Sequence, residues 1–370
     1  MALGCGRTPK YVRGMHRNDD FSPLPPSRPA AEPFRTAWGG GAGQAPQPPL
    51  SGEPAHSAPA PGRRGPRAVP PGVEYHRVLA GDKRRIGRGV LAIVLLVAGL
   101  FVFSFALTQA AAFLDTRMGN TNPTSGGTDY TPLYHAAGMF SLALLIPWSM
   151  LLQRWLYGVR GASLHSVVSG FRFDVFGRAL LFIGPAWLVA VFVMNVSAPV
   201  EQTYWPVADL VGVLVGTLLL TPLQSAGEEY GLRGLVFRVA GSWSRGPRIG
   251  LVLGVLVSSL LFTTIHGAGD PWINLWYFTL AVSLAVITWR TGGIEIAVVV
   301  HALLNTLTFI IVTALHSDIG SAVMDRSVGT GSVVLLVPSV TVAVIAAVVW
   351  LRTRRSGPAL TPSGPHPVRG

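Results

Sequence analysis

Eight apolar runs between residues 89 and 351 constrain the fold of this chain more than any other feature. They lie near residues 89–113, 133–153, 179–198, 207–240, 249–266, 272–289, 294–315 and 332–351. As a helix, each run is long enough to cross about 30 Å of hydrocarbon. Only 12% of the residues are charged, which excludes an ordinary water-soluble protein. We therefore predict an all-α, polytopic membrane helix bundle with about eight transmembrane helices.

Basic residues predict the orientation of this bundle. They gather before the first run, after the last run and in alternate loops, whereas the opposite loops carry only Arg117 and Arg326. The positive-inside rule then gives an N-in/C-in protein. We attribute the net charge of +12 to this distribution of basic residues and not to nucleic-acid binding. We therefore expect the lipid bilayer as a partner and no nucleic acid. Lys10 and Lys83 are the only lysines, a skew typical of GC-rich bacteria, so we expect a multi-pass protein of the bacterial inner (plasma) membrane.

The two ends of the chain differ from the bundle in composition. Between Phe21 and Gly72 stand 14 of the 29 prolines, with no apolar period. Such a segment buries too little surface to offset its ordering entropy. We expect a disordered cytoplasmic tail over residues 1–85, with a solvated His76, a membrane helical domain over 86–352 and a short disordered cytoplasmic tail over 353–370. A proline-rich ligand for a partner domain and a later true start codon are alternatives for the first tail.

The fourth run contains two adjacent carboxylates and a guanidinium, Glu228, Glu229 and Arg233. A charged residue near the centre of a membrane helix costs about 2.5–3.5 kcal/mol, so such groups are rare and are functional by default. Glu229 and Arg233 are four residues apart and can pair on one helical face. Glu228 points about 100° away around the helix and is free to act as a general base on water.

Two further apolar runs carry polar insertions. Phe262-Thr263-Thr264-Ile265-His266 ends the fifth run, and His301 and Asn305 share one face of the seventh. A lone membrane histidine, such as His135, is more often an interhelical hydrogen-bond partner than a catalyst. The co-occurrence of Glu-Glu-x-x-x-Arg, Phe-x-x-x-His and His-x-x-x-Asn on three runs favours a catalytic site.

Over roughly residues 130–315, these motifs resemble those of the CPBP intramembrane proteases, also called the CAAX-protease, bacteriocin-processing or Abi family. The resemblance implies an endopeptidase acting on a hydrophobic or membrane-associated peptide. It also implies that Glu228 and His266 activate the hydrolytic water. By the same resemblance, His301 and Asn305 stabilise the oxyanion, while Glu229 and Arg233 hold the site together.

The motifs leave the metal question open. Glu228, His266 and His301 could ligate zinc as a three-residue site with an open position. There is no His-Glu-x-x-His pattern, and Cys5 is the only cysteine, far from these residues in the sequence. We therefore favour a glutamate-type reaction that requires no cofactor, with zinc as the alternative.

Two other functions remain as hypotheses. One is a non-catalytic membrane scaffold or immunity protein of the same fold, and the other is a polytopic transporter whose buried charges line a path. The sequence leaves the oligomeric state open.

One feature of the simple topology conflicts with a shared site. It sets His266 about 24 Å from the inner membrane edge but His301 only about 10 Å from it. Convergence requires the fifth run to begin beyond that edge or to tilt. Gly267-Ala268-Gly269 would then turn inside the protein, beside a water-filled cavity.

Overall fold

The computed structural model describes residues 65–364, except residue 200 and residues 320–323. Over these residues the chain is helical, with isolated β-bridges and no strand. Eight helical segments are long and apolar enough to cross a membrane, which confirms the predicted multi-pass bundle. Their bounds are Ile86–Arg117, Pro132–Tyr157, Phe173–Ser197, Val207–Gly241, Pro247–Ile265, Pro271–Thr291, Glu295–Ala314 and Val333–Thr353. The N-in/C-in orientation stays a prediction.

Five of these eight segments are single helices. The last segment is a helix preceded by a short 3-10 turn. The single helices are α1 (Ile86–Arg117), α4 (Phe173–Ser197), α7 (Pro247–Ile265), α8 (Pro271–Thr291) and α9 (Glu295–Ala314). The last segment is the turn Val333–Leu335 followed by α10 (Leu336–Thr353).

The second segment is interrupted near its middle. It consists of α2 (Pro132–Ala143) and α3 (Leu145–Tyr157), joined at Leu144. Pro147 explains the break, because its ring removes a backbone donor and clashes with the carbonyl four residues earlier.

The fourth segment changes its winding close to the predicted site. It runs as α5 (Val207–Glu229), a π-helix (Tyr230–Val236) and α6 (Phe237–Gly241). A proline inside a helix commonly kinks or breaks it, yet α5 continues through Pro222. The irregular turn follows Glu229 instead, and π segments of this kind occur often at functional sites.

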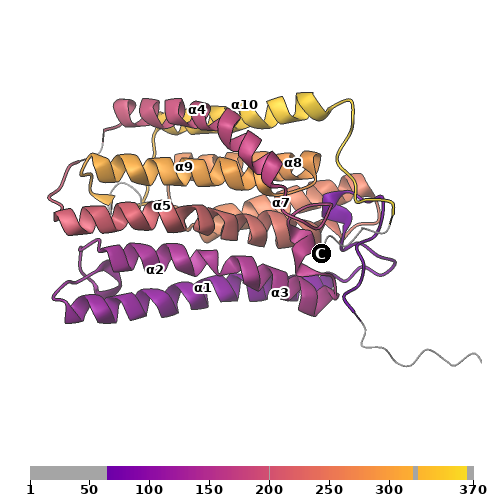
Figure 1. The fold of residues 1–370 in the computed structure, drawn as a ribbon, viewed down its shortest axis with the longest axis horizontal. Coiled ribbons are helices and arrows are strands. Elements are labelled where there is room, and N and C mark those ends of the chain that lie inside the picture. Colours follow the sequence, from indigo (N-terminus) through magenta and orange to yellow (C-terminus); the bar gives the residue numbers. More distant parts are fainter. Residues whose placement is uncertain (1–64, 200, 320–323, 365–370) are drawn as a thin grey trace, which may run out of the picture. The chain divides into compact units, whose positions relative to one another are not determined.

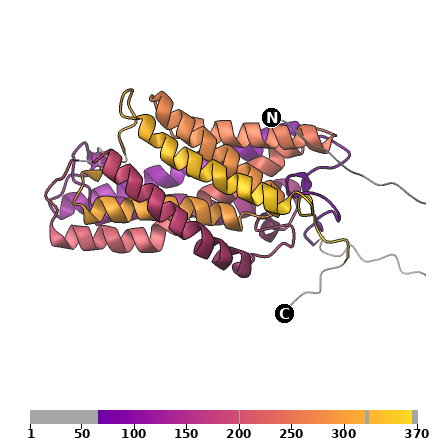
Figure 2. The ribbon, with the colours of Figure 1, turned by 90° about the horizontal axis from the view of Figure 1, so that it is seen from above.

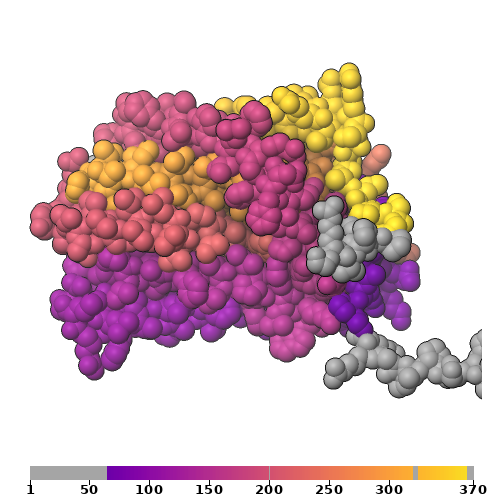
Figure 3. Space-filling view, in the orientation of Figure 1, coloured from indigo at the N-terminus to yellow at the C-terminus, as the bar shows by residue number. Residues whose placement is uncertain are grey.

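The helices form a bundle in which α5 occupies a central place. It packs against α2 on one side and α9 on the other, and α9 in turn packs against α4. Figure 1 and the space-filling view in Figure 3 show this order from α1 through α2, α5 and α9 to α4. The pair α7 and α8 packs on another side of the bundle, with α10 along α8, as Figure 2 shows from above.

The helices begin at different levels along the bundle. This stagger explains how His266 and His301, which the simple topology places at different depths, reach the same level. The segment Val207–Gly241 has 35 residues, so it is about 52 Å long. α7 packs against α6 at the far end of that segment, and His266 follows α7 after about 28 Å. α9 starts nearer the middle, so His301 lies only about 9 Å from its first residue. Figures 1 and 2 show that α7 extends beyond the start of α9.

The segment before α1 differs from the predicted tail. Residues 1–64 lie outside the described residues, but Tyr75 and His76 are fully buried. The Tyr75 hydroxyl donates to the Leu164 carbonyl at 2.5 Å, and a His76 ring nitrogen lies 3.1 Å from the Pro247 carbonyl. The expected solvation of His76 is therefore wrong, and the bundle begins before residue 85.

The end of the chain also packs onto the bundle. The Val73 amide donates to the Thr361 hydroxyl at 2.9 Å, and that hydroxyl donates to the Pro70 carbonyl at 2.6 Å. The segments before α1 and after α10 therefore meet at one end of the bundle. Residues 365–370 of the predicted second tail lie outside the described residues.

At Gly227, α5 packs directly against the backbone of α2. A Cβ atom at this position would lie 2.0 Å from the Leu142 carbonyl oxygen and 3.2 Å from the Ala143 Cα. Both neighbours are backbone atoms, which cannot move aside as a side chain can. Only glycine therefore permits this contact, one residue before Glu228.

We predict that Gly227→Ala destabilises the protein. The added methyl group must push α2 and α5 apart, at a cost of about 1–3 kcal/mol or more. Thermal unfolding in detergent micelles measures the loss. Gly184→Ala in α4 is the control, because nothing lies within 4 Å of its Cβ position. Equal melting temperatures for the two variants would show that the close contact is not needed.

Candidate active site

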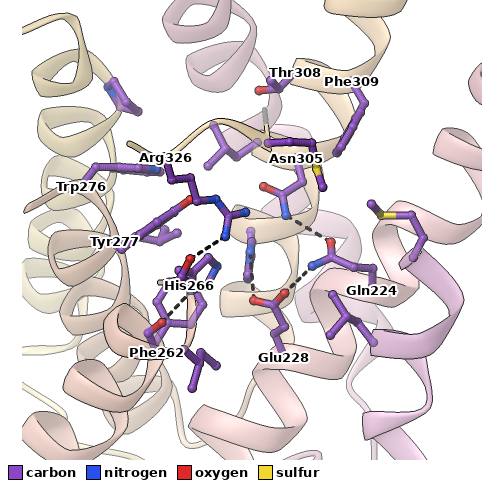
Figure 4. A pocket seen from close by; sticks show the side chains of 18 of the residues that line it. Gln224, Glu228, Phe262, His266, Trp276, Tyr277, Asn305, Thr308, Phe309 and Arg326 are labelled. Carbon is purple, nitrogen blue, oxygen red and sulfur yellow. Dashed lines mark hydrogen bonds and ion pairs between the residues drawn. The ribbon is translucent and has the colours of Figure 1, made fainter. Parts of the chain in front are cut away.

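A cavity of about 410 Å³ collects the polar residues of three separate helices. Gln224 and Glu228 come from α5, His266 follows α7, and His301 and Asn305 come from α9. Figure 4 shows the labelled polar side chains pointing toward a common space. Four of the six predicted site residues, Glu228, His266, His301 and Asn305, therefore line one cavity. Glu229 and Arg233 lie behind its wall and are fully buried.

Glu228 presents one carboxylate oxygen to this cavity. Its Oε1 accepts a hydrogen bond from the Gln224 amide at 2.5 Å, one helical turn earlier. Its Oε2 is buried and accepts no hydrogen bond from a described residue. The His301 ring lies close by, with its Nε2 3.9 Å from Oε2. This oxygen is thus positioned to take a proton from a molecule in the cavity.

Glu229 joins two helices through its two oxygens. Oε1 lies 2.8 Å from Nδ1 of His301 on α9, and Oε2 lies 3.2 Å from Nε of Arg233 in the π segment. The Arg233 guanidinium also lies over the Phe262 ring, 4.4 Å from its centroid. The predicted pairing of Glu229 and Arg233 is therefore confirmed. Because an ionised carboxylate only accepts, Nδ1 of His301 donates, and its Nε2 faces the cavity.

His266 is held by the backbone at the end of α7. Its Nδ1 lies 2.6 Å from the Phe262 carbonyl, so Nδ1 carries the proton and Nε2 remains free. Its ring packs on Tyr277 of α8, with centroids 4.1 Å apart. Gly267, with φ of 63°, turns the chain directly afterwards. Glycine suits this left-handed conformation because it has no Cβ. Gly267 and Gly269 are exposed, so this turn lies at the surface of the bundle and not inside the protein as expected.

Arg326 reaches this turn from the segment between α9 and α10. Its Nη1 donates to the His266 carbonyl at 2.8 Å, and its own carbonyl accepts from the Gly269 amide at 2.8 Å. Its side chain also lines the cavity, as Figure 4 shows. The residue therefore fixes the turn that orients His266.

Asn305 closes the polar side of the cavity. Its amide nitrogen donates to Oε1 of Gln224 at 3.2 Å and to Oγ of Ser225 at 3.3 Å. These bonds are long, so a stronger acceptor could replace either of them. The structure thus brings together the residues of all three motifs, from α5, α7 and α9.

Sequence reasoning missed three residues of the site: Gln224, Tyr277 and Arg326. Gln224 precedes Glu228 by one helical turn and shares its face, a spacing that could have indicated the contact. Arg326 is one of only two arginines in the loops predicted to face outward. Its departure from the positive-inside pattern could have indicated a specific role. Nothing in the sequence around Tyr277 indicates its contact with His266.

The residues present do not form a metal site in this geometry. Among the described residues, no three His, Cys, Asp or Glu side chains are grouped so that they could hold a metal ion. The predicted zinc ligands Glu228, His266 and His301 therefore share a cavity without a coordination arrangement.

Asp270 fastens the Arg326 segment to the start of α8. Its Oδ1 accepts from the Trp272 amide at 2.8 Å, and its Oδ2 accepts from the Gly329 amide at 2.9 Å. Burial alone would raise the pKa of this carboxyl, but the backbone donors together outweigh it and lower the pKa below its ordinary value of 3.8. The ionised form therefore stabilises the fold.

We predict that Asp270→Asn lowers the melting temperature near neutral pH, because an amide loses the charge and one acceptor. A lowered pKa gives stability that is complete above the ordinary value of 3.8 and is lost as the pH falls through the folded-state pKa. The difference from the wild type should therefore shrink in acid. Thermal unfolding across pH tests this, with Asp174→Asn in an exposed ion pair as the control. A difference that does not change with pH would contradict it.

Comparison with known proteins agrees with the motifs. Residues 209–307 match the family model described as type II CAAX prenyl endopeptidase Rce1-like. This range contains all six predicted site residues. No curated protein and no solved structure matches the chain. Residues 209–307 thus form a domain of the Rce1-like type II CAAX prenyl endopeptidase family, which is consistent with the CPBP family that the motifs resemble.

Proposed function

We propose that this protein is an endopeptidase that hydrolyses peptide bonds of hydrophobic or membrane-associated peptides with a water molecule activated by Glu228. The Rce1-like domain within a multi-pass bundle supports an intramembrane protease. One observation supports the proposed mechanism most strongly. The buried Oε2 of Glu228 accepts no hydrogen bond from any described residue and faces a cavity shared with two histidines.

The walls of the cavity favour an apolar substrate. The polar floor of the cavity consists of Gln224, Glu228, His266, His301 and Asn305. Most of the other lining residues are aliphatic, aromatic or methionine. They include Leu100, Met139, Met194, Trp276, Leu304 and Phe309. An extended peptide with apolar side chains would bury surface against these walls, which is favourable at roughly 25 cal/mol per Å². The carbonyl of its scissile bond would then meet the polar floor.

In the proposed first step, a water molecule lies between Glu228 and His266. Oε2 of Glu228 accepts one of its protons, and the free Nε2 of His266 accepts a hydrogen bond from the other. The water oxygen forms a bond to the carbonyl carbon, and the electron pair of the C=O bond moves to its oxygen. Glu228 then holds the transferred proton.

The oxyanion would be stabilised by His301 and Asn305. To donate to the oxyanion, the His301 ring would carry a proton on both nitrogens, with Nδ1–H directed to Glu229 and Nε2–H into the cavity. Its Nε2–H and the Asn305 amide are then two donors for the developing negative charge. In the last step the C–N bond breaks, and Glu228 returns its proton to the leaving amine.

Glu229 and Arg233 act as positioning residues in this proposal. They touch neither substrate nor water, because both are fully buried behind the wall. Their contacts fix the orientation of the His301 ring and the direction of its Nε2. Removing one partner of such a buried pair typically costs about 3–5 kcal/mol, so these variants would lose stability as well as activity.

We predict that Glu228→Gln abolishes turnover while peptide binding is kept. Glutamine preserves the shape and the Gln224 contact but cannot accept a proton, so kcat should fall about 10²–10⁴-fold. Cleavage of a hydrophobic peptide library by the purified protein measures the loss, with Glu201→Gln, an exposed carboxylate, as the control. Wild-type kcat in Glu228→Gln would overturn the proposal and favour a scaffold.

We predict that metal chelators leave the activity unchanged. If no metal takes part, dialysis against EDTA or 1,10-phenanthroline should change kcat by less than about twofold, whereas stripped zinc enzymes lose it. Elemental analysis of the same samples should find no stoichiometric zinc. Loss of activity on chelation, with recovery on adding Zn²⁺, would instead establish the alternative.

A further inference from the structure

A second cavity, of about 380 Å³, lies where the chain enters α1. It shares no lining residue with the cavity around Glu228. Its walls come from the segment before α1 and from the end of α3. Three basic residues line it, Arg67, Lys83 and Arg85, together with a single acidic residue, Asp82. The cavity therefore carries about two net positive charges.

The three cations that line the cavity form no ion pair with a described residue. No ion pair or side-chain hydrogen bond joins Arg67, Lys83 or Arg85 to any described group. The neighbouring arginines do have partners, since Arg77 donates to the Gly241 carbonyl at 2.6 Å and Arg88 donates to the Leu156 carbonyl at 2.8 Å. The cationic groups around the cavity are thus available to an anion.

A buried hydroxyl in the wall also lacks a partner. Tyr157 is only 4% exposed, and its hydroxyl makes no hydrogen bond to a described residue. It lines the cavity and lies within electrostatic reach of the Arg85 guanidinium. A buried hydroxyl without a partner costs free energy, so a ligand that supplies an acceptor would be stabilised here.

The segment that forms the walls is held firmly in place. The Arg67 amide donates to the Gly158 carbonyl at 2.8 Å, directly after Tyr157. Further along, the fully buried Tyr75 and His76 tie the same segment to the bundle. The basic groups are therefore presented on a fixed backbone.

The cavity lies at the level where two membrane spans end. Lys83 and Arg85 directly precede the span Ile86–Arg117, and Tyr157 is the last residue of the span Pro132–Tyr157. We expect this level to lie near the lipid phosphates when the bundle is in a bilayer. The chemistry of the walls, guanidinium, ammonium and hydroxyl donors, matches the oxygens of a phosphate.

We propose that this cavity binds a phosphate group, carried by a lipid headgroup or by a soluble phosphate compound. Arg67, Lys83 and Arg85 supply the charge, and the Tyr157 hydroxyl donates to a phosphate oxygen. Because the site is separate from the Glu228 cavity, this proposal does not depend on the proposed hydrolysis.

The test measures thermal unfolding of the full chain in a neutral detergent. Inorganic phosphate, dioctanoyl phosphatidylglycerol and dioctanoyl phosphatidylcholine are titrated separately. The pocket variant combines three substitutions in one protein: Arg67→Gln, Lys83→Gln and Arg85→Gln. The matched control, Arg84→Gln, Arg352→Gln, Arg354→Gln, removes the same charge from exposed residues that do not line the cavity. Tyr157→Phe removes the hydroxyl alone.

The expected result is a saturable rise in melting temperature for the wild type and the control. Affinity should be at least roughly tenfold weaker in the pocket variant and reduced in Tyr157→Phe. A response to the two lipids alone would identify a headgroup site, and a response to inorganic phosphate would identify a soluble ligand. No saturable response, or equal responses in the pocket variant and the control, would overturn the proposal.

Discussion

The site depends on the contacts that the Glu229 carboxylate makes with Arg233 and His301. The two carboxylate oxygens contact Arg233 in the π segment and His301 on α9, and all three residues are buried. Buried charges are tolerated only when they are paired, so this arrangement has little freedom to change. It joins the fourth and seventh membrane segments and sets the direction of the His301 ring. Glu228, the residue before Glu229, is thereby left to face the cavity.

The shape of the bundle supports this arrangement through the lengths of its helices. The long segment that ends in α6 lets α7 begin far from the start of α9, so that His266 reaches the level of His301. Gly227 allows α5 to touch the backbone of α2 beside the two carboxylates. Arg326 and Asp270 then hold the turn after His266 in place.

The sequence alone predicts much of this fold because its signals are strong. Apolar runs define the membrane segments, and costly ionisable residues within them indicate the site. His135 also fits its prediction, since it lies between the Tyr130 and Thr217 hydroxyls of the bundle. The packing of Tyr75 and His76 could not be predicted, because a few residues in a proline-rich segment show no periodicity. The place of Arg326 depends on how a long loop folds back, which hydropathy does not encode.

The central claim is that water, activated by Glu228, attacks the peptide bond directly. A single turnover in H₂¹⁸O, with the protein in excess over a hydrophobic peptide, tests this claim. Mass spectrometry of the products and of the digested protein locates the label. The account predicts ¹⁸O in the new carboxylate of the peptide and none in Glu228. Label in the Glu228 carboxylate would contradict it, because that result requires a covalent acyl intermediate on this side chain.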